Sequence, residues 1–286
     1  MEDPWSPLLA LADDRTLGAT DTTEQAARAL ALFPPEDLAD AIETLLRAHP
    51  GMAPLWRLAD ILLTRNPPVS VERFVADLGD HELAAVVAAP VLPSTLLTIS
   101  CSSAVNEAIR LRKPFTVLCM TSNPGAEGYQ MAGLASAWSD AVMIADDEAI
   151  AKVPAAAVVV GADAITPSAV INKVKTLALV QAARDRGIPA YAMTGTSKFV
   201  SFELPVGEPL EATPIELFEQ IGAPGGMLAP TAAAARAASV KLHPALEMLA
   251  DKLRQELARP PEAQEDGDEE ADVAPPQAGP AATAGG

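Results

Sequence analysis

Apolar positions in the first third of the chain recur every three or four residues, a spacing that predicts amphipathic helices. Residues 21–24 (Asp-Thr-Thr-Glu) have the spacing of a capping box ahead of an Ala/Leu run, which predicts a helix start there. Residues 34–37 (Pro-Pro-Glu-Asp) predict the start of a second helix, because proline suits the first turn. Further helices are predicted over 55–64 and after Ser70. Together these segments predict a helical bundle over residues 1–93.

From about residue 94 the pattern changes to short apolar runs separated by helical segments. The runs cover residues 96–100, 115–120, 141–144, 156–160 and 190–193. A strong helix is predicted over 171–186, and another over 231–258 with a break at His243-Pro244. Strands alternating with helices form βαβ units, and continuous apolar runs are typical of parallel strands buried on both faces. The predicted fold class is therefore α/β, with a Rossmann-like parallel-sheet domain over residues 94–258.

Residues 259–286 differ in composition from the rest of the chain. They contain seven acidic residues, five prolines and no aromatic residue. Such a segment cannot bury enough apolar area to offset the entropy lost on folding. We predict a disordered acidic tail, which either only solvates the protein or binds a partner.

The formal net charge of −18 argues against binding nucleic acid by phosphate neutralisation and against docking on anionic lipid. A small anionic ligand stays compatible with it, because such a ligand needs only a few local donors. No run approaches the ~20 apolar residues of a membrane helix. Cys101 and Cys119 lack metal-site spacing, and the three histidines are scattered. We expect a soluble, cytoplasmic protein without a bound metal or cofactor.

Ligands of parallel α/β sheets bind outside the carboxyl ends of the strands, so the loops after the apolar runs are the candidate site. After the first run, Ser100, Ser102 and Ser103 lead into a helix, where they can cap that helix or hold a phosphate. After the second run, a Gly/Pro-containing loop carries Asn123 and suits either a ligand contact or an ordinary surface turn.

Two further loops carry the more polar candidates. Gly161 and Asp163 follow the fourth run, and an Asp there can accept from sugar hydroxyls, move a proton or simply cap a loop. Asn172 and Lys173 lie at the start of the predicted helix over 171–186, where the dipole and the lysine charge favour an anion.

Several strings taken together resemble the initiation factor 2B alpha/beta/delta superfamily, which also contains the isomerases of methylthioribose-1-phosphate and ribose-1,5-bisphosphate. The most specific are residues 159–165 (Val-Val-Gly-Ala-Asp-Ala-Ile), Asn172-Lys173 with Thr176, and residues 187–191 (Gly-Ile-Pro-Ala-Tyr). The first loop of the family, in its initiation-factor form, resembles residues 97–103, and its C-terminal segment resembles residues 208–214. The resemblance covers about residues 94–230.

The resemblance implies a helical N-terminal domain and a Rossmann-like domain through which members commonly pair, so a second copy or a related subunit is the expected protein partner. It also implies a pocket for a phosphorylated sugar or nucleotide. Asp163 matches the Asp that works with a Cys in isomerase acid–base chemistry, and Asn172 and Lys173 match the ligand-contacting pair. The candidate catalytic residues are Asp163 and Cys101, and the candidate ligand-binding residues are Ser100, Ser102, Ser103, Asn123, Gly161, Asn172, Lys173 and Lys175.

The chain departs from the isomerases at positions that matter for catalysis. Their Cys follows Leu-Thr-His directly, whereas here Ser100 holds that position and Cys101 comes one place later. One helical residue turns a side chain by about 100°, which predicts a Cys101 directed away from the substrate. Their Thr-Arg-Pro is Ser-Asn-Pro here, so Asn123 offers a phosphate no charge. Lys175 replaces a family glycine, either supplying the missing charge or lying solvated on the helix.

These departures favour an initiation factor 2B-like protein that binds a phosphorylated sugar or nucleotide in a regulatory, non-catalytic role. The alternative is an aldose-1-phosphate isomerase that uses Asp163 and Cys101. A third hypothesis is a structural subunit without a ligand.

Overall fold

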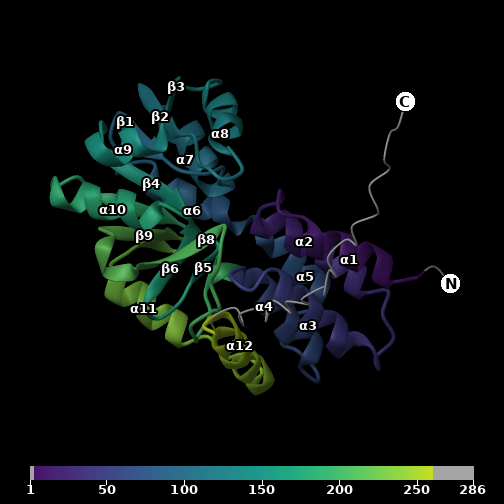
Figure 1. Ribbon diagram of the computed structural model, residues 1–286. Helices are drawn as coiled ribbons and strands as arrows, with labels where there is room; N and C mark the ends of the chain where they lie inside the picture. The colour runs from purple at the N-terminus through teal and green to yellow at the C-terminus, as the bar shows by residue number, and fades with distance from the viewer. Residues whose placement is uncertain (1–2, 260–286) are drawn as a thin grey trace, which may run out of the picture.

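The computed structural model describes residues 3–259 and has the predicted α/β fold. Figure 1 shows a group of N-terminal helices beside a larger part built on a mostly parallel sheet. The predicted tail covers residues 259–286, and all of it from residue 260 onward lies outside the described residues.

The N-terminal helices pack around a shared apolar core. They are α1 (Trp5–Asp13), α2 (Ala19–Leu30), α3 (Leu38–Ala48), α4 (Ala53–Leu63) and α5 (Val71–Ala76). The core contains Leu45, Leu46, Trp56 and Leu58, all almost completely buried. The helices predicted after residues 34–37 and over 55–64 are thus confirmed as α3 and α4.

Helix α2 begins earlier than its sequence signal indicates. The predicted start at the capping box over 21–24 is wrong, because the helix begins at Ala19 after an extended Gly18. Thr22 and Thr23 lie inside the helix, and their hydroxyls donate to the carbonyl oxygens of Gly18 and Ala19 at 3.0 and 2.7 Å. Threonines that hydrogen-bond back to the preceding turn are compatible with a helix interior, so the sequence match to a cap was misleading here.

The helix predicted after Ser70 is divided in two. Ser70 caps α5, its Oγ accepting from the Arg73 N–H at 3.3 Å. A 3₁₀ turn over Asp77–Asp80 then leads into α6 (His81–Ala88). The buried face of α6 consists of alanines, whose small side chains let the helix pack closely against the main sheet and α7.

The main sheet has the strand order β10-β9-β7-β4-β1-β2-β3 and is parallel except for β10. Its strands are β1 (Thr95–Thr98), β2 (Thr116–Met120), β3 (Asp140–Ile144), β4 (Ala157–Gly161), β7 (Ala190–Met193), β9 (Gln220–Ala223) and β10 (Gly226–Leu228). Each of the five predicted runs corresponds to one of these strands. Central β4 is buried along its whole length, which explains its continuous apolar sequence.

The two faces of this sheet contribute to separate apolar cores. Val158 and Val160 point into a core with α9 (Asp146–Lys152), α10 (Thr176–Asp185) and α11 (Pro230–Ala238). Ala157 and Val159 point into the other, with α6, α7 (Ser103–Arg112) and α8 (Gly128–Ala135). Alternate residues of a strand face opposite sides, so one apolar run serves both cores.

The molecule has a second sheet, which is antiparallel and includes residues that were predicted to be helical. It comprises β5 (Ala164–Ile165), β6 (Ala169–Lys173) and β8 (Leu210–Pro214). The helix predicted over 171–186 is wrong in its first turn, where Ile171 pairs with Ala212 across the β6–β8 ladder. Lys175 has a left-handed backbone with φ +79°, which separates the strand from α10. Helical periodicity could not reveal a strand partner so distant in the sequence.

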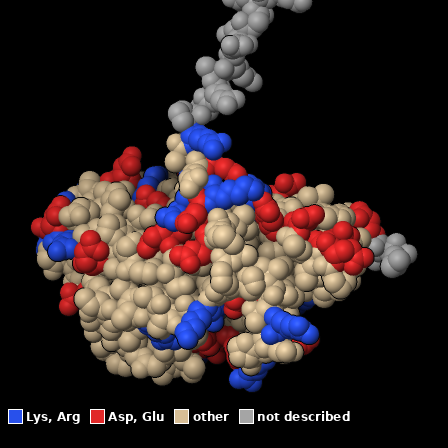
Figure 2. All heavy atoms as spheres, turned by 90° about the horizontal axis from the view of Figure 1, so that it is seen from below, with Lys and Arg blue, Asp and Glu red and all other residues tan. Residues whose placement is uncertain are grey.

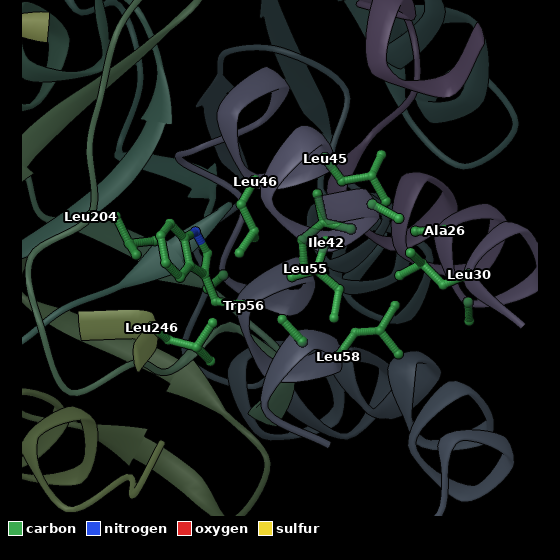
Figure 3. Close-up of a cluster of buried hydrophobic side chains, with 14 of the residues drawn as sticks. Ala26, Leu30, Ile42, Leu45, Leu46, Leu55, Trp56, Leu58, Leu204 and Leu246 are labelled. Carbon is green, nitrogen blue, oxygen red and sulfur yellow. The ribbon is translucent and has the colours of Figure 1, made fainter. Parts of the chain in front are cut away.

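The last helix, α12 (Pro244–Leu257), joins the N-terminal core, and the predicted break at His243-Pro244 is confirmed. Figure 3 shows Trp56 of α4 beside Leu204 and Leu246, so residues from both ends of the chain share one core. Ala164 and Ile171 of the second sheet contribute to the same core. The N-terminal helices therefore pack on a surface that the C-terminal half provides.

Candidate functional site

A cavity of about 500 Å³ lies between the N-terminal helices and the carboxyl ends of β1, β4 and β6. Its walls come from the N-terminal part of α2, the α3–α4 turn, the β1–α7 turn, the start of α8 and the segment before β8. The predicted candidates that line it are Ser100, Cys101, Ser102, Ser103, Gly161, Asp163, Asn172 and Lys173. Residues from three strand ends thus meet in one place.

The β1–α7 turn is held in a defined shape. Ser100 has a left-handed backbone with φ +65°, and its N–H donates to Ser122 Oγ at 2.7 Å. Ser102 is the N-cap of α7, and its Oγ accepts from the Val105 N–H at 3.5 Å. A Cβ on Gly161 would lie 2.5 Å from Ser102 Oγ, so glycine allows the end of β4 to approach this turn. Ser102 and the first residues of α7 line the cavity, a location that favours an anion.

The backbone of Asp163 links the second sheet to the N-terminal helices at the cavity. Its N–H donates to the Ile171 carbonyl at 2.7 Å, and its carbonyl accepts from the Ala53 N–H at 3.1 Å. Burial raises the pKa of the Asp163 carboxyl, while the positive charges of Lys198 and Lys173 oppose that rise. A carboxyl with a raised pKa in a cavity is suited to holding or moving a proton.

Asn172 and Lys173 end β6, not begin a helix as predicted. Asn172 Nδ2 donates to Thr176 Oγ1 at 3.1 Å, and Thr176 Oγ1 donates to the Lys173 carbonyl at 2.6 Å. Lys173 Nζ donates to Glu127 Oε1 at 2.6 Å and to the Pro124 carbonyl oxygen. An ammonium carries three N–H donors, and these two contacts use two of them.

Cys101 is among the residues that line the cavity, and the predicted direction of its side chain stays a prediction. Burial, together with the negative charge of Glu127, raises the pKa of the Cys101 thiol. The side chain therefore stays protonated at neutral pH. Burial also raises the pKa of Cys119, in β2, to about 12.

Asn123 and Lys175 are not among the residues that line the cavity; they meet at Asp146 instead. Asp146 accepts from the Ser122 and Asn123 N–H groups at 2.7 and 3.0 Å and from Lys175 Nζ at 2.7 Å. Burial alone would raise the pKa of Asp146, but these three donors hold it below its usual value. Lys175 therefore holds the loop after β2 in place through Asp146.

Lys198 is a cavity residue that the sequence reasoning missed. It follows β7, so the rule that selects the other post-strand loops applies to this one too. Burial lowers the pKa of Lys198, while the charges of Asp163 and Asp80 oppose the decrease. Arg15 and the first turn of α2 also line the cavity, and only the packing of the helices on the sheet could reveal that.

Within residues 3–259, no group of three His, Cys, Asp or Glu side chains is arranged to hold a metal ion. In the same part of the chain, no helix is long and apolar enough to cross a membrane. Acidic and basic side chains intermingle on the face shown in Figure 2.

Residues 7–221 match the model of the initiation factor 2 subunit family. The chain belongs to that family. A comparison with curated protein sequences finds no match. Similar solved structures include the translation initiation factor eIF-2B of Pyrococcus horikoshii OT3, with 25% identity, a TM-score of 0.68, and coverage of 80% of this chain and 98% of that one.

Two more distant structures share the family fold. A 5-methylthioribose 1-phosphate isomerase of Pyrococcus horikoshii OT3 has 17% identity and a TM-score of 0.56, covering 89% of this chain and 88% of its own. A tetrameric eIF2B-beta2-delta2 complex of C. thermophilum has 17% identity and a TM-score of 0.63, covering 82% and 93%. At 17% sequence identity, both similarities show only that the fold is shared.

Proposed function

We propose that this family member binds a phosphorylated sugar or nucleotide in the cavity and acts in a regulatory, non-catalytic role. The observation that supports binding is the convergence of Asn172, Lys173, Lys198 and the α7 N-terminus on one cavity of about 500 Å³. Cationic side chains and free N–H groups suit the phosphate, and carboxylate and amide oxygens suit hydroxyl groups.

The non-catalytic role is supported by the residue at the isomerase cysteine position. Ser100 stands there, and a serine hydroxyl has a far higher pKa than a thiol, which makes it a poor proton shuttle near neutral pH. The nearby Asn123 has its backbone fixed by Asp146 and offers no cationic side chain to a phosphate.

Binding is tested by titrating ribose 5-phosphate and adenosine 5′-monophosphate into the protein in a calorimeter. Lys173→Ala should weaken binding by about tenfold to a hundredfold, because it removes a charge-assisted donor and leaves Glu127 unpaired in the wall. Lys152→Ala, which removes a lysine from a surface ion pair, is the matched control. Binding of neither ligand to the unmodified protein would contradict the proposal.

An isomerase role is the second candidate, favoured by one observation. Asp163, with its raised pKa, and Cys101 line the same cavity. A ketose assay on methylthioribose-1-phosphate and ribose-1,5-bisphosphate separates the two roles. We expect little or no turnover; robust turnover abolished by both Asp163→Asn and Cys101→Ala would establish the isomerase instead.

We also propose that the chain pairs with a second copy or with related subunits. The complex of beta and delta subunits among the similar structures supports this expectation. Sedimentation velocity of the chain alone, over a range of concentrations, distinguishes a self-paired protein from one that needs another subunit.

A further inference from the structure

Lys175 has a backbone conformation that its residue type does not favour. Its φ of +79° lies in the left-handed region, where a side chain costs free energy and glycine does not. Glycine would separate β6 from α10 at no such cost. What lysine adds at this position is therefore its side chain.

The ammonium of Lys175 neutralises a buried carboxylate outside the cavity. Lys175 Nζ donates to Asp146 Oδ2 at 2.7 Å. The side chain of Asp146, the first residue of α9, is only 4% exposed, whereas that of Lys175 is 34% exposed. Neither residue is among those that line the cavity. Removing the ammonium takes away the ion-pair partner of a buried charge, which is costly.

Asp146 also binds the loop that supports the β1–α7 turn. Its carboxylate oxygens accept from the N–H groups of Ser122 and Asn123 at 2.7 and 3.0 Å. Ser122 is fully buried, and its Oγ in turn accepts from the Ser100 N–H at 2.7 Å. Ser122 and Ser100 both have left-handed backbones, with φ of +67° and +65°. Such conformations persist where the surrounding groups hold them, and this series of contacts begins at Lys175.

Both ends of this series of contacts belong to the walls of the cavity. Ser100 lines it together with Ser102, the N-cap of α7. Lys175 follows Asn172 and Lys173, which line the cavity from the end of β6. The ion pair of Lys175 therefore ties two walls of the cavity together from outside it.

On the basis of the proposed ligand-binding function, we propose that Lys175 and Asp146 are positioning residues, whose ion pair fixes the β1–α7 turn in the conformation that binds the ligand. Removing the ammonium then weakens binding, although it takes no group away from the cavity lining.

The variants Lys175→Gly and Lys175→Arg test this inference. Glycine removes the ammonium and also relieves the left-handed backbone, so a loss of binding cannot come from backbone strain. Arginine keeps a cation at the same backbone cost and should preserve the behaviour of the unmodified protein. Lys152→Ala is the control, because it removes a lysine of α9 whose ion pair with Glu148 is exposed.

The first measurement needs no ligand. The Ser100 amide should exchange its hydrogen at least about tenfold faster in Lys175→Gly than in the unmodified protein, as measured by hydrogen exchange with NMR. Lys175→Arg and Lys152→Ala should leave this rate unchanged. The amide of Val159, in the buried central strand β4, reports opening of the whole molecule and should not follow Ser100.

The second measurement is calorimetric titration with whichever of ribose 5-phosphate and adenosine 5′-monophosphate the unmodified protein binds. Lys175→Gly should weaken binding by about fivefold or more, the loss expected when one hydrogen bond to the ligand is misplaced. In a Ser122→Ala background the same substitution should have little further effect, because the contact with Ser100 is already lost.

An unchanged Ser100 amide in Lys175→Gly overturns the inference, and so does faster exchange that Val159 matches, because the ion pair then only stabilises the whole fold. A faster Ser100 amide with unchanged affinity overturns it as well and leaves the proposed function standing. If the unmodified protein binds neither ligand, the proposed function fails, and the role in binding inferred for Lys175 fails with it.

Discussion

His49 is a buried histidine beside the cavity, at the turn between α3 and α4. Its Nε2–H donates to the Leu11 carbonyl oxygen at 2.9 Å, which ties α1 to this turn. Burial lowers the pKa of His49 from its ordinary value of 6.5, and the charge of Arg15 adds to that effect. The hydrogen bond to Leu11 and the charge of Asp14 oppose it only in part.

This shift predicts a loss of stability in mild acid. As the pH falls below 6.5, the unfolded chain binds a proton at His49 before the folded protein does, so the free energy of unfolding decreases. Above that pH both states are neutral at this residue and it has no effect. His49→Gln should show a smaller decrease between pH 7 and pH 5 in urea unfolding. An identical decrease in both proteins would mean that His49 is not the group responsible.

Helix α12 is the element that joins the C-terminal end of the chain to the N-terminal core. Leu246, Ala250 and Leu253 lie in the same cluster as Trp56 of α4. The His243 N–H also donates to Asp60 Oδ1 at 2.7 Å, which holds the start of α12 against α4. These two residues are 183 positions apart in the sequence, so the N-terminal helices are stabilised by residues far away along the chain.

Truncating one core residue of α12 should destabilise the molecule strongly. Leu246→Ala should reduce the free energy of unfolding by about 2–5 kcal/mol, because it removes buried methyl groups and leaves a cavity. Met248→Ala is the matched control on the same helix, since Met248 is 66% exposed and should cost less than about 0.5 kcal/mol. Urea unfolding measures both. Similar small losses in the two variants would show that α12 does not contribute to the core.

At the scale of the whole molecule, charge is unevenly distributed along the sequence. The formal net charge is −18, and seven acidic residues lie in the predicted tail. Like charges concentrated in one segment repel one another and keep that segment solvated. The composition of the tail therefore predicts that folding does not depend on it.

Deleting residues 260–286 should change the melting temperature by less than about 2 °C, the size expected when no packed group is lost. Differential scanning calorimetry of the full and shortened chains provides the comparison. A decrease of many degrees would mean that the deleted segment packs against the folded part, and the predicted boundary would be wrong.

The sequence by itself determined the fold class, the five strands of the main sheet recognised from apolar runs, and the family. Local physics suffices for these features: an apolar run such as 157–160 has to be buried whatever its partners are, and the post-strand loops follow from chain order. The same reasoning selected Asp163, Asn172 and Lys173, which the structure brings to one cavity.

Only the tertiary structure decided features that depend on partners distant in the sequence. Ile171 lies in a strand because it pairs with Ala212 of β8. Asn123 and Lys175 lie outside the cavity lining, where Asp146 accepts hydrogen bonds from both. Hydrogen bonds, ion pairs and burial depend on distances in space, and no local pattern of residue types contains those distances.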